Sequence, residues 1–443
     1  MTTLGFDDLK TRLRLPDPGR AMHDVIRELY PICRSITGNG VRQTLKVVGR
    51  HVPLEIHEVP SGTRVLDWVV PKEWNIRDAW VKDPSGAKII NFQSSNLHVV
   101  GYSVPVRERM PLTELKKHLF SLPDKPDWIA YRNTFYRDDW GFCVSHRQLQ
   151  SLADGQYEVF IDSAHTDGSL TYGEALIAGR SSREILLCCH VCHPSLANDN
   201  LSGISLLALL GRYLVELSPH FSYRLLFLPV TIGAITWLAR NESALSKIEH
   251  GVVVTLVGDA GGITYKRSRR GDAAIDRAFA HVLKHAGEHQ IVDFTPYGYD
   301  ERQFCSPGFD LPVGCLMRTP HGEFPEYHTS ADDLAFVKPE ALADSLAKLL
   351  AVLDVLENNR SYLSENPKGE PQLGRRGIYR AMAERADGSA REMALLWVLN
   401  QSDGKHSLLD IADRSGYPFE SIREAASLLQ EHKLLRELEE GAS

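Results

Sequence analysis

The chain has 443 residues, which is too many for a single hydrophobic core and predicts two or three domains. Its composition, 43% hydrophobic and 24% charged residues, is that of a globular protein and argues against disorder. The formal net charge of -7 argues against a general binder of nucleic acids or membrane surfaces, so we expect neither as a partner.

The first residues and the cysteines indicate the cellular compartment. Residues 1–10 lack the apolar stretch of a signal peptide, and no run approaches the ~18 apolar residues of a membrane span. The seven cysteines are scattered and stand mostly within apolar runs. Because disulfides are rare in the cytosol, this pattern indicates reduced, buried thiols in a cytoplasmic protein.

In the first third of the chain, the residue composition and pattern change after about residue 55. Residues 17–50 predict two helices joined by a polar turn at 35–40. From 55 to 165, tryptophans, short alternating segments and many turn residues predict a small β-rich domain or insertion.

From residue 184 onward, apolar strands alternate with helices. This alternation predicts a mostly parallel sheet with helices on both faces. The predicted strands are Ile185–Cys189, Tyr223–Val230, Gly251–Val257 and Leu311–Met317, and the predicted helices are Leu201–Glu216, Ile232–Leu245, Asp272–Glu288 and Pro339–Glu357.

The C-terminal part of the chain follows a linker rich in proline and glycine at 367–374. Its predicted helices at 393–400, 408–412 and 419–432 have the layout of a winged-helix domain. Residues 375–443 hold 10 Lys and Arg against 12 Asp and Glu, so the module lacks the positive charge of a DNA reader. We therefore expect a structural or protein-contact role, which includes contacts in a homo-oligomer.

Side chains that could carry chemistry stand where the predicted strands end. The loop after the first strand holds His190, His193 and Asp199, and Asp259 and His328 follow two later strands. Because ligands bind at the carboxyl ends of parallel strands, these groups could meet at one edge and hold Zn²⁺. The alternative for each residue taken alone is a polar loop residue or a helix cap.

Several motifs in these loops resemble a known superfamily. The run 198–203 (NDNLSG) resembles the A-N-D-N-x-S-G signature of the co-catalytic zinc aminopeptidases, a superfamily that includes the glutaminyl cyclases. The runs 192–195 (CHPS), 300–308 (DERQFCSPG) and 326–332 (EYHTSAD) resemble more closely a bacterial family of aminopeptidase-like proteins. The match extends over about residues 20–435.

The resemblance implies a fold and a domain order. The expected architecture is a three-layer α/β/α zinc aminopeptidase-like domain formed by residues 1–60 and 166–366. A β-rich inserted domain at 61–165 would cover the active-site cleft, and a winged-helix domain would occupy 375–443.

The resemblance also implies roles for particular residues. His193, Asp199 and His328 are the expected ligands of one zinc ion, and a second ion is possible because the aspartate bridges two ions in relatives. His190 competes with His193, which we prefer because it carries the Cys-His-Pro pattern. Asp300 and Asp259 are expected to position a substrate amino group, and both belong to the predicted catalytic set. Asp259 lies near the position of another acidic ligand, where a direct strand alignment would instead place Thr255.

The chain departs from the family at the expected general base. Where the close family has P-E-T-I-G, residues 229–233 are PVTIG, so Val230 stands in place of the glutamate. Valine cannot accept a proton, and loss of a general base costs ~10²–10⁴-fold in rate. Glu301, Glu323 or Glu326 could replace it, and Glu326 completes the predicted catalytic set. Thr231 replaces a neighbouring acidic ligand, which puts the second metal in question.

The function that these patterns predict is zinc-dependent hydrolysis of an amide bond in a small peptide or an amino-acid conjugate. A second hypothesis is non-hydrolytic Lewis-acid chemistry, such as acyl transfer or cyclisation in a biosynthetic pathway. A third is a catalytically silent metal-binding protein. The chain has no P-loop and no G-x-S-x-G elbow, so nucleotide and serine-hydrolase chemistry are not indicated.

Overall fold

The computed structural model describes residues 4–378 and 388–438, which fall into two compact units. The larger unit contains Phe6–Ala273 and Gln290–Leu346. The smaller unit contains Ala274–His289 and the chain from Ala347 onward. In the described residues, no helix is both long enough and apolar enough to cross a membrane.

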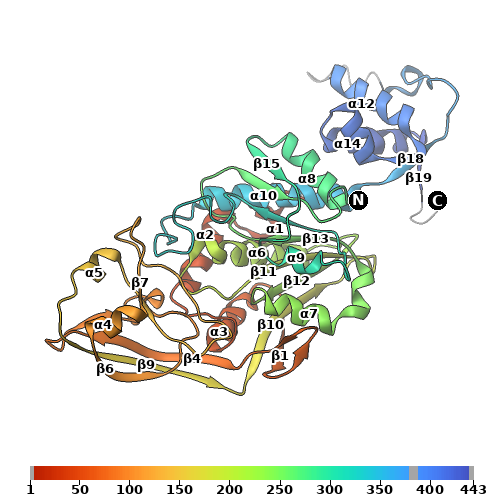
Figure 1. Ribbon diagram of the computed structural model, residues 1–443. Coiled ribbons are helices and arrows are strands. Elements are labelled where there is room, and N and C mark those ends of the chain that lie inside the picture. Colours follow the sequence, from red (N-terminus) through yellow and green to blue (C-terminus); the bar gives the residue numbers. More distant parts are fainter. Residues whose placement is uncertain (1–3, 379–387, 439–443) are drawn as a thin grey trace. The chain divides into compact units, whose positions relative to one another are not determined.

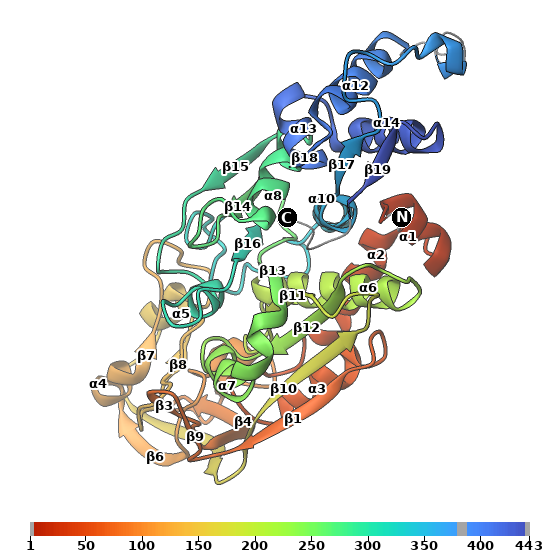
Figure 2. The same cartoon turned by 90° about the vertical axis from the view of Figure 1, so that its right-hand side faces the viewer.

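The main sheet has eight strands within the described residues, in the order β1-β10-β12-β11-β13-β16-β14-β15 (Figures 1 and 2). The inner strands β12, β11, β13 and β16 are parallel, as predicted, whereas β1, β10 and β14 pair antiparallel at the flanks. The strands are β1 Glu55–Pro60, β10 Ser169–Ile177, β11 Glu184–His190, β12 Ser222–Leu228, β13 Ile248–Val254, β14 Ile263–Lys266, β15 His289–Val292 and β16 Val313–Met317.

The central strands are buried on both faces, which is why their sequences are continuous apolar runs. Every residue of β11 and β12 is buried. On one face, Leu186 and Cys188 belong to the same core cluster as Trp237 of α7 (Ile232–Arg240). On the other face, α6 (Gly203–Val215) packs closely enough that a Cβ on Gly211 would meet Leu225 of β12. These layers confirm the predicted α/β/α architecture.

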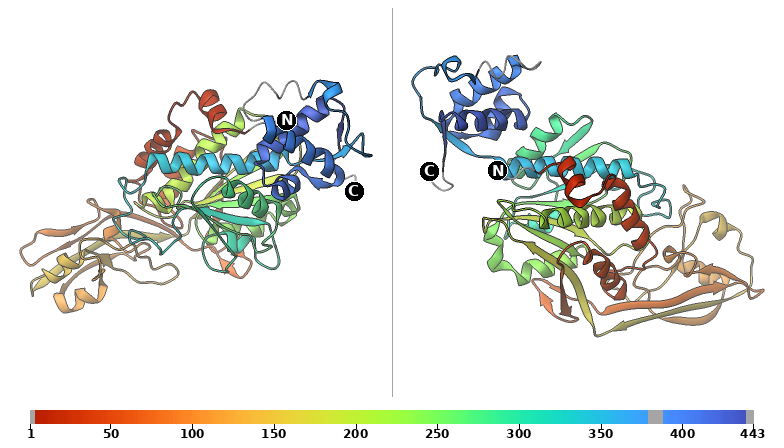
Figure 3. Two further views of the ribbon diagram at one scale, coloured as in Figure 1. Left: turned by 90° about the horizontal axis from the view of Figure 1, so that it is seen from above. Right: turned by 180° about the vertical axis from the view of Figure 1, so that it is seen from behind.

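Helices from the start of the chain share the face of the sheet that α6 covers (Figure 3). These are α1 Phe6–Leu13, α2 Pro18–Leu29 and α3 Asn39–Val48. The short helix α9 (Glu301–Phe304) contacts α7 on the opposite face. Helix α10 spans Pro339–Asn358. The first helices match the two predicted between residues 17 and 50.

The β-rich region predicted between 55 and 165 contains a four-stranded sheet in the order β5-β4-β9-β6 (Figure 2). Alternate residues such as Val81, Val159 and Ile161 face a separate apolar core. Its elements are β2 Arg64–Val65, β3 Trp68–Val69, β4 Glu73–Lys82, β5 Lys88–Asn91, β6 Val106–Pro111, α4 Leu112–Leu115, β7 Leu119–Phe120, β8 Phe142–Cys143, α5 His146–Gln150 and β9 Gln156–Thr166.

The winged-helix domain predicted at the C-terminus has its three helices and a small sheet in the order β18-β17-β19. A capping box between Ser407 and Asp410 begins its second helix, and Gly416 ends that helix with φ of 75°. Strand β17 precedes the predicted linker, so the small sheet includes residues on both sides of 367–374. The elements are β17 Ser361–Ser364, α12 Gly388–Gln401, β18 Asp403–Ser407, α13 Leu408–Ser415, α14 Phe419–Glu431 and β19 Leu435–Glu437.

Within the smaller unit, helix α8 (Ala274–Lys284) contacts the winged helix through charged groups. Arg277 Nη2 donates to Asp410 at 2.7 Å and to Asp413 at 3.1 Å. The His281 ring nitrogen Nδ1 lies 2.8 Å from Asp413. Acidic residues of α13 therefore form contacts with α8, and the role expected for this module stays a prediction.

Candidate metal centre

The candidate site lies at the carboxyl end of β11, where the order of the sheet reverses. The chain leaves β11 for β12 on one side and later returns to β13 on the other side of β11. Such a switch point leaves a crevice between the loops that diverge there, and ligands of α/β proteins bind in it. His190 is the last residue of β11, and the loop that follows carries His193 and Asp199.

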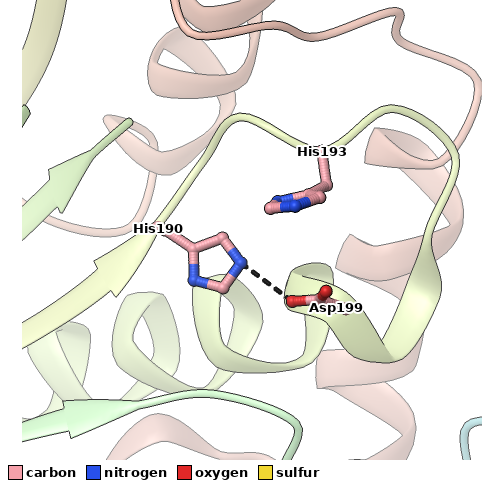
Figure 4. A group of neighbouring side chains, drawn as sticks. All are labelled: His190, His193 and Asp199. Atoms are coloured by element: carbon pink, nitrogen blue, oxygen red, sulfur yellow. Dashed lines mark hydrogen bonds and ion pairs between the residues drawn. The ribbon is translucent and has the colours of Figure 1, made fainter. Parts of the chain in front are cut away.

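His190, His193 and Asp199 converge although they are spread over ten residues (Figure 4). Their ligand atoms all lie within 4.8 Å of one another. The His190 Nε2 atom is 2.9 Å from Asp199 Oδ1, and the rings of the two histidines are 4.9 Å apart between centroids. All three side chains are buried, Asp199 completely. The structure thus brings both competing histidines to the aspartate, rather than one of them.

His328 reaches the same aspartate from a loop far along the chain. Its Nε2 atom lies 2.9 Å from Asp199 Oδ2, and its ring centroid is 5.3 Å from that of His193. Asp199 therefore uses one carboxylate oxygen for each of two imidazoles. The three residues predicted as ligands, His193, Asp199 and His328, lie together, and His190 joins them.

The donor set fits zinc in both atom type and charge. Imidazole nitrogens and carboxylate oxygens are preferred zinc ligands, and they must be deprotonated to bind. Burial lowers the pKa of His193 to about 3, so its ring is neutral near neutral pH. Burial alone would raise the pKa of Asp199, but His193 and the hydrogen bonds from His190 and His328 hold it well below its usual range.

Two buried charged residues fix the loop that carries the ligands. The Asp332 carboxylate accepts hydrogen bonds from the backbone N–H groups of Asn198 at 2.6 Å and Asp199 at 3.0 Å. Arg34 Nε donates to the His193 carbonyl oxygen at 3.0 Å. Sequence reasoning missed both roles. Asp332 does end one of the motifs that carry the family resemblance, whereas nothing near Arg34 in the sequence indicates such a contact.

The asparagines on either side of Asp199 tie the same loop to the end of β13. Asn198 Oδ1 accepts from the Gly258 N–H at 2.8 Å, and Asn200 Nδ2 donates to the Val254 carbonyl at 3.1 Å. Each side-chain amide thus forms a hydrogen bond with a backbone group that is not paired between strands of the sheet. In the A-N-D-N motif, the two asparagine amides therefore hold the loop in place, and the single carboxylate between them contacts the histidines.

Asp259, predicted as a catalytic residue, has both carboxylate oxygens occupied by the protein. They accept from Thr319 Oγ1 at 2.6 Å, from the Gly261 N–H at 2.8 Å and from Asn198 Nδ2 at 3.1 Å. The structure does not bring Asp259 into contact with the histidines. Its catalytic role stays a prediction, and these contacts describe a residue that braces the loop.

Asp300, predicted to orient a substrate amine, is 1% exposed, and neither carboxylate oxygen has a hydrogen-bond partner in the described residues. Burial and the neighbouring Glu301 raise its pKa well above its usual range. A buried carboxyl without partners is costly, so such groups mark strain or a ligand-binding position. Asp300 directly follows Tyr299, whose ring stacks on His190 at 5.2 Å between centroids.

Glu326, the third predicted catalytic residue, is half-buried and lines a surface hollow together with Trp128, Ser330 and Phe336. None of the candidate ligands lines that hollow. The catalytic role of Glu326 therefore stays a prediction.

Glu301 and the basic run 266–270 are committed to ion pairs. Lys266 Nζ lies 2.8 Å from Glu301 Oε1, and both side chains are buried. Arg269 and Arg270 pair with Asp310 at 2.7 and 3.4 Å. Glu301 Oε2 has no hydrogen-bond partner in the described residues, so the role of Glu301 as a replacement base stays a prediction.

The position of the missing glutamate lies just after β12. Val230 is half-buried and packs against the core cluster that contains Cys192 and Phe304. The Thr231 hydroxyl accepts a hydrogen bond from Arg302 at 3.4 Å. The Thr255 hydroxyl at the end of β13 is fully buried and has no partner in the described residues. The groups at these three positions are therefore neutral, and they offer no carboxylate to a second metal ion.

The inserted domain contributes a residue to the centre that sequence reasoning missed. The Tyr131 ring lies 5.0 Å, between centroids, from both His193 and His328. The Tyr131 N–H donates to the His328 carbonyl at 2.8 Å, and a β-bridge joins Ala130 to Thr329. No motif marks Tyr131 in the sequence, because its role depends on a contact across about 200 residues.

Comparison with known proteins defines the class to which this fold and site belong. Residues 23–359 match the model of a family described as a domain of unknown function, DUF4910, and residues 360–437 match a winged helix-turn-helix model. The first match covers most of the chain, so the chain belongs to the DUF4910 family.

Individual relatives agree with this assignment. A protein of Clostridium acetobutylicum, named "Putative polysaccharide biosynthesis protein with aminopeptidase-like domain", is 52% identical over 421 residues, which are 95% of this chain and 97% of the relative. A crystal structure described as a "putative peptidase" from the same organism has a TM-score of 0.93 at 50% identity and covers 98% of this chain and 100% of that one.

The likeness extends to a characterised fold. A zinc aminopeptidase from Bacillus subtilis has a TM-score of 0.56 at 12% identity and covers 76% of this chain and 95% of that one. The larger unit therefore has the aminopeptidase-like fold that the motifs predicted.

Proposed function

We propose that this chain is a zinc-dependent amidohydrolase that acts on a small peptide or an amino-acid conjugate. The observation that carries the proposal is the convergence of the ligand atoms of His190, His193 and Asp199 within 4.8 Å. His328 adds an imidazole at the second oxygen of the aspartate, 2.9 Å away. Zinc in such a set supplies Lewis acidity toward a carbonyl oxygen and lowers the pKa of water to ~7.

The carboxyl of Asp300 is suited to bind the substrate. Its two oxygens have no hydrogen-bond partner within the described part of the chain, so they can accept hydrogen bonds from a free amino group next to the scissile amide. Burial favours the protonated form of this carboxyl. An ammonium group beside it would favour the charged form again, because opposite charges stabilise each other.

Hydrolysis needs a group that accepts a proton from the attacking water, and the side chain of Val230 cannot accept one. Another residue must therefore accept this proton. Of the predicted catalytic carboxylates, Asp300 is better placed than Glu326, since Glu326 lines a hollow that the ligands do not line. Asp259 is held by Thr319 and Asn198 and braces the loop instead. We therefore assign both amine binding and proton transfer to Asp300.

The relative's name supports a biosynthetic setting rather than general digestion. That protein is named for polysaccharide biosynthesis with an aminopeptidase-like domain. A substrate in such a pathway would be a small conjugate, which agrees with a ligand loop covered by Tyr131 of the insertion. The same name and the missing glutamate favour a second candidate, a Lewis-acid enzyme that catalyses acyl transfer or cyclisation.

The first experiment measures the metal content of the purified protein by plasma mass spectrometry, together with fluorophore release from a panel of aminoacyl amides. Zinc near one equivalent with turnover supports the hydrolase. Zinc without turnover, in a protein from which Asp199→Ala removes the metal, counts against hydrolysis and leaves non-hydrolytic Lewis-acid chemistry or a metal-binding role. A stoichiometric metal content in Asp199→Ala would reject the ligand set itself.

A further inference from the structure

Four aromatic side chains form a continuous ridge beside the metal centre. These residues, called the aromatic ridge below, are Tyr297, Tyr299, His321 and Tyr327. The His321 ring is the hub, with centroid distances of 5.5 Å to Tyr297, 5.5 Å to Tyr299 and 6.3 Å to Tyr327. The residues come from two loops, one before α9 and one after β16.

The inner end of the ridge contacts the candidate ligands directly. Tyr299 stacks on His190 with an interplanar angle of 13°, and Tyr327 stacks on His328 at 3.9 Å and 14°. At the outer end, Tyr297 is 69% exposed, which is unusual for a large aromatic ring. The ridge therefore leads from solvent to two of the histidines that would hold the metal.

The ridge is held in place by the protein without any ligand. Lys266 Nζ donates to the carbonyl oxygens of Thr295 at 2.8 Å and Tyr297 at 2.6 Å, and it pairs with buried Glu301 at 2.8 Å. One cation thus binds two backbone carbonyls in the segment that leads to Tyr299 and the side chain of Glu301 beyond it. A preformed surface of this kind binds without an ordering cost.

The angles between the rings of the aromatic ridge, and the polar groups beside them, favour one kind of ligand ring. The ring planes of Tyr297, Tyr299 and Tyr327 are inclined by 51°, 85° and 50° to that of His321, so none of them stacks on His321. Buried polar atoms without a hydrogen-bond partner in the described residues lie in the same two loops: the Nδ1 atom of His321, and both oxygens of Asp300, which directly follows Tyr299. A substrate phenyl ring would leave these groups unsatisfied, at a cost comparable to a lost hydrogen bond.

A pyranose ring matches both properties. It presents an apolar C–H face, which packs on aromatic rings, and a rim of hydroxyl groups, which donate to carboxylates and imidazole nitrogens. We propose that the aromatic ridge binds the pyranose ring of a sugar-linked substrate, with the sugar toward Tyr297 and the amide toward His190 and His328. This inference rests on the proposed function and names the substrate class of that site.

The test is saturation-transfer NMR on the zinc-loaded full-length protein, with methyl β-glucopyranoside and N-acetylglucosamine as sugar probes and phenylalaninamide as the aromatic probe. We expect transfer to the ring C–H protons of both sugars. Because one aromatic contact contributes about 1 kcal/mol, Tyr297→Ala should weaken sugar binding about fivefold. Tyr297→Phe keeps the ring and should retain binding.

The matched control is Tyr136→Ala. Tyr136 is also a tyrosine on the surface, 50% exposed, and contacts Trp68 in the insertion rather than the ridge. Its loss should leave sugar binding unchanged. Equal binding by wild type and Tyr297→Ala would overturn the ridge as the binding surface, and transfer to phenylalaninamide without transfer to sugars would overturn the sugar. Neither measurement requires turnover, so failure of amide hydrolysis with intact sugar binding would reject only the proposed reaction.

Discussion

Lys266 offers a sharp test of how the loop beside the metal centre is stabilised. The residue is 5% exposed, and its ammonium group makes three contacts, with Glu301 and with the carbonyl oxygens of Thr295 and Tyr297. Lys266→Met keeps the length of the side chain but leaves the buried Glu301 carboxylate unpaired. Breaking a buried ion pair in this way costs about 3–5 kcal/mol. The two carbonyls lie on exposed residues and can bind water, so they add little.

The free energy of unfolding is measured by urea titration of the zinc-loaded protein, with an optical probe in the larger unit. We expect Lys266→Met to lower it by about 4 kcal/mol. Adding Glu301→Gln removes the unpaired charge and should restore about 2 kcal/mol, since a neutral amide without partners costs less than a buried charge. A loss below about 1 kcal/mol in the single variant, or no recovery in the double variant, would refute the assigned ion pair.

Other predictions concern the centre and its surroundings. Val230→Glu should raise amide hydrolysis more than tenfold, the low end of a general-base contribution, and an unchanged kcat/KM in a zinc-loaded variant would show that Val230 is not at the base position. Asp332→Ala leaves two backbone N–H groups unpaired beside Asp199 and should weaken zinc binding, measured by competition with a chelator, by about tenfold or more; unchanged affinity would count against that support. Burial lowers the pKa of His250 to about 4, against 6.5 unfolded, so its contribution to stability is complete above pH 6.5 and is lost as the pH falls toward 4. When the pH falls from 7.5 to 5, the free energy of unfolding of the wild type should therefore fall by about 2 kcal/mol more than that of His250→Gln. Equal losses in the two proteins would contradict this assignment.

The central strands of the sheet could be predicted because each of them has a recognisable sequence pattern. The runs around Leu187 and Leu225 are continuous and apolar, since both faces of these strands are covered, and the four predicted strands lie where the structure has β11, β12, β13 and β16. The flanking strands β1 and β10 were not predicted individually. They pair antiparallel at the margin of the sheet, and their sequences mix polar and apolar residues.

The site was predictable to the extent that its residues belong to local motifs. His193 and Asp199 share one loop, and His328 stands in a second motif. The choice between His190 and His193 could not be made from spacing, because the loop returns on itself and brings both rings to Asp199. Arg34 and Tyr131 could not be found at all, since each reaches the centre by a contact between segments far apart in the chain.

The bridge between the insertion and the His328 loop has a consequence for the order of assembly. Ile129 and Tyr131 exchange backbone hydrogen bonds with Ser330 and His328, so the conformation of one candidate ligand depends on a segment about 200 residues away. Contacts of such long range form slowly, because the intervening chain must first be organised. The other candidate ligands lie at the end of β11 and in the loop that follows it, which Asp332 holds through the backbone N–H groups of Asn198 and Asp199. If the proposed metal binds, we expect the nascent protein to acquire it late, because the closing of this bridge fixes the loop that brings His328 to Asp199.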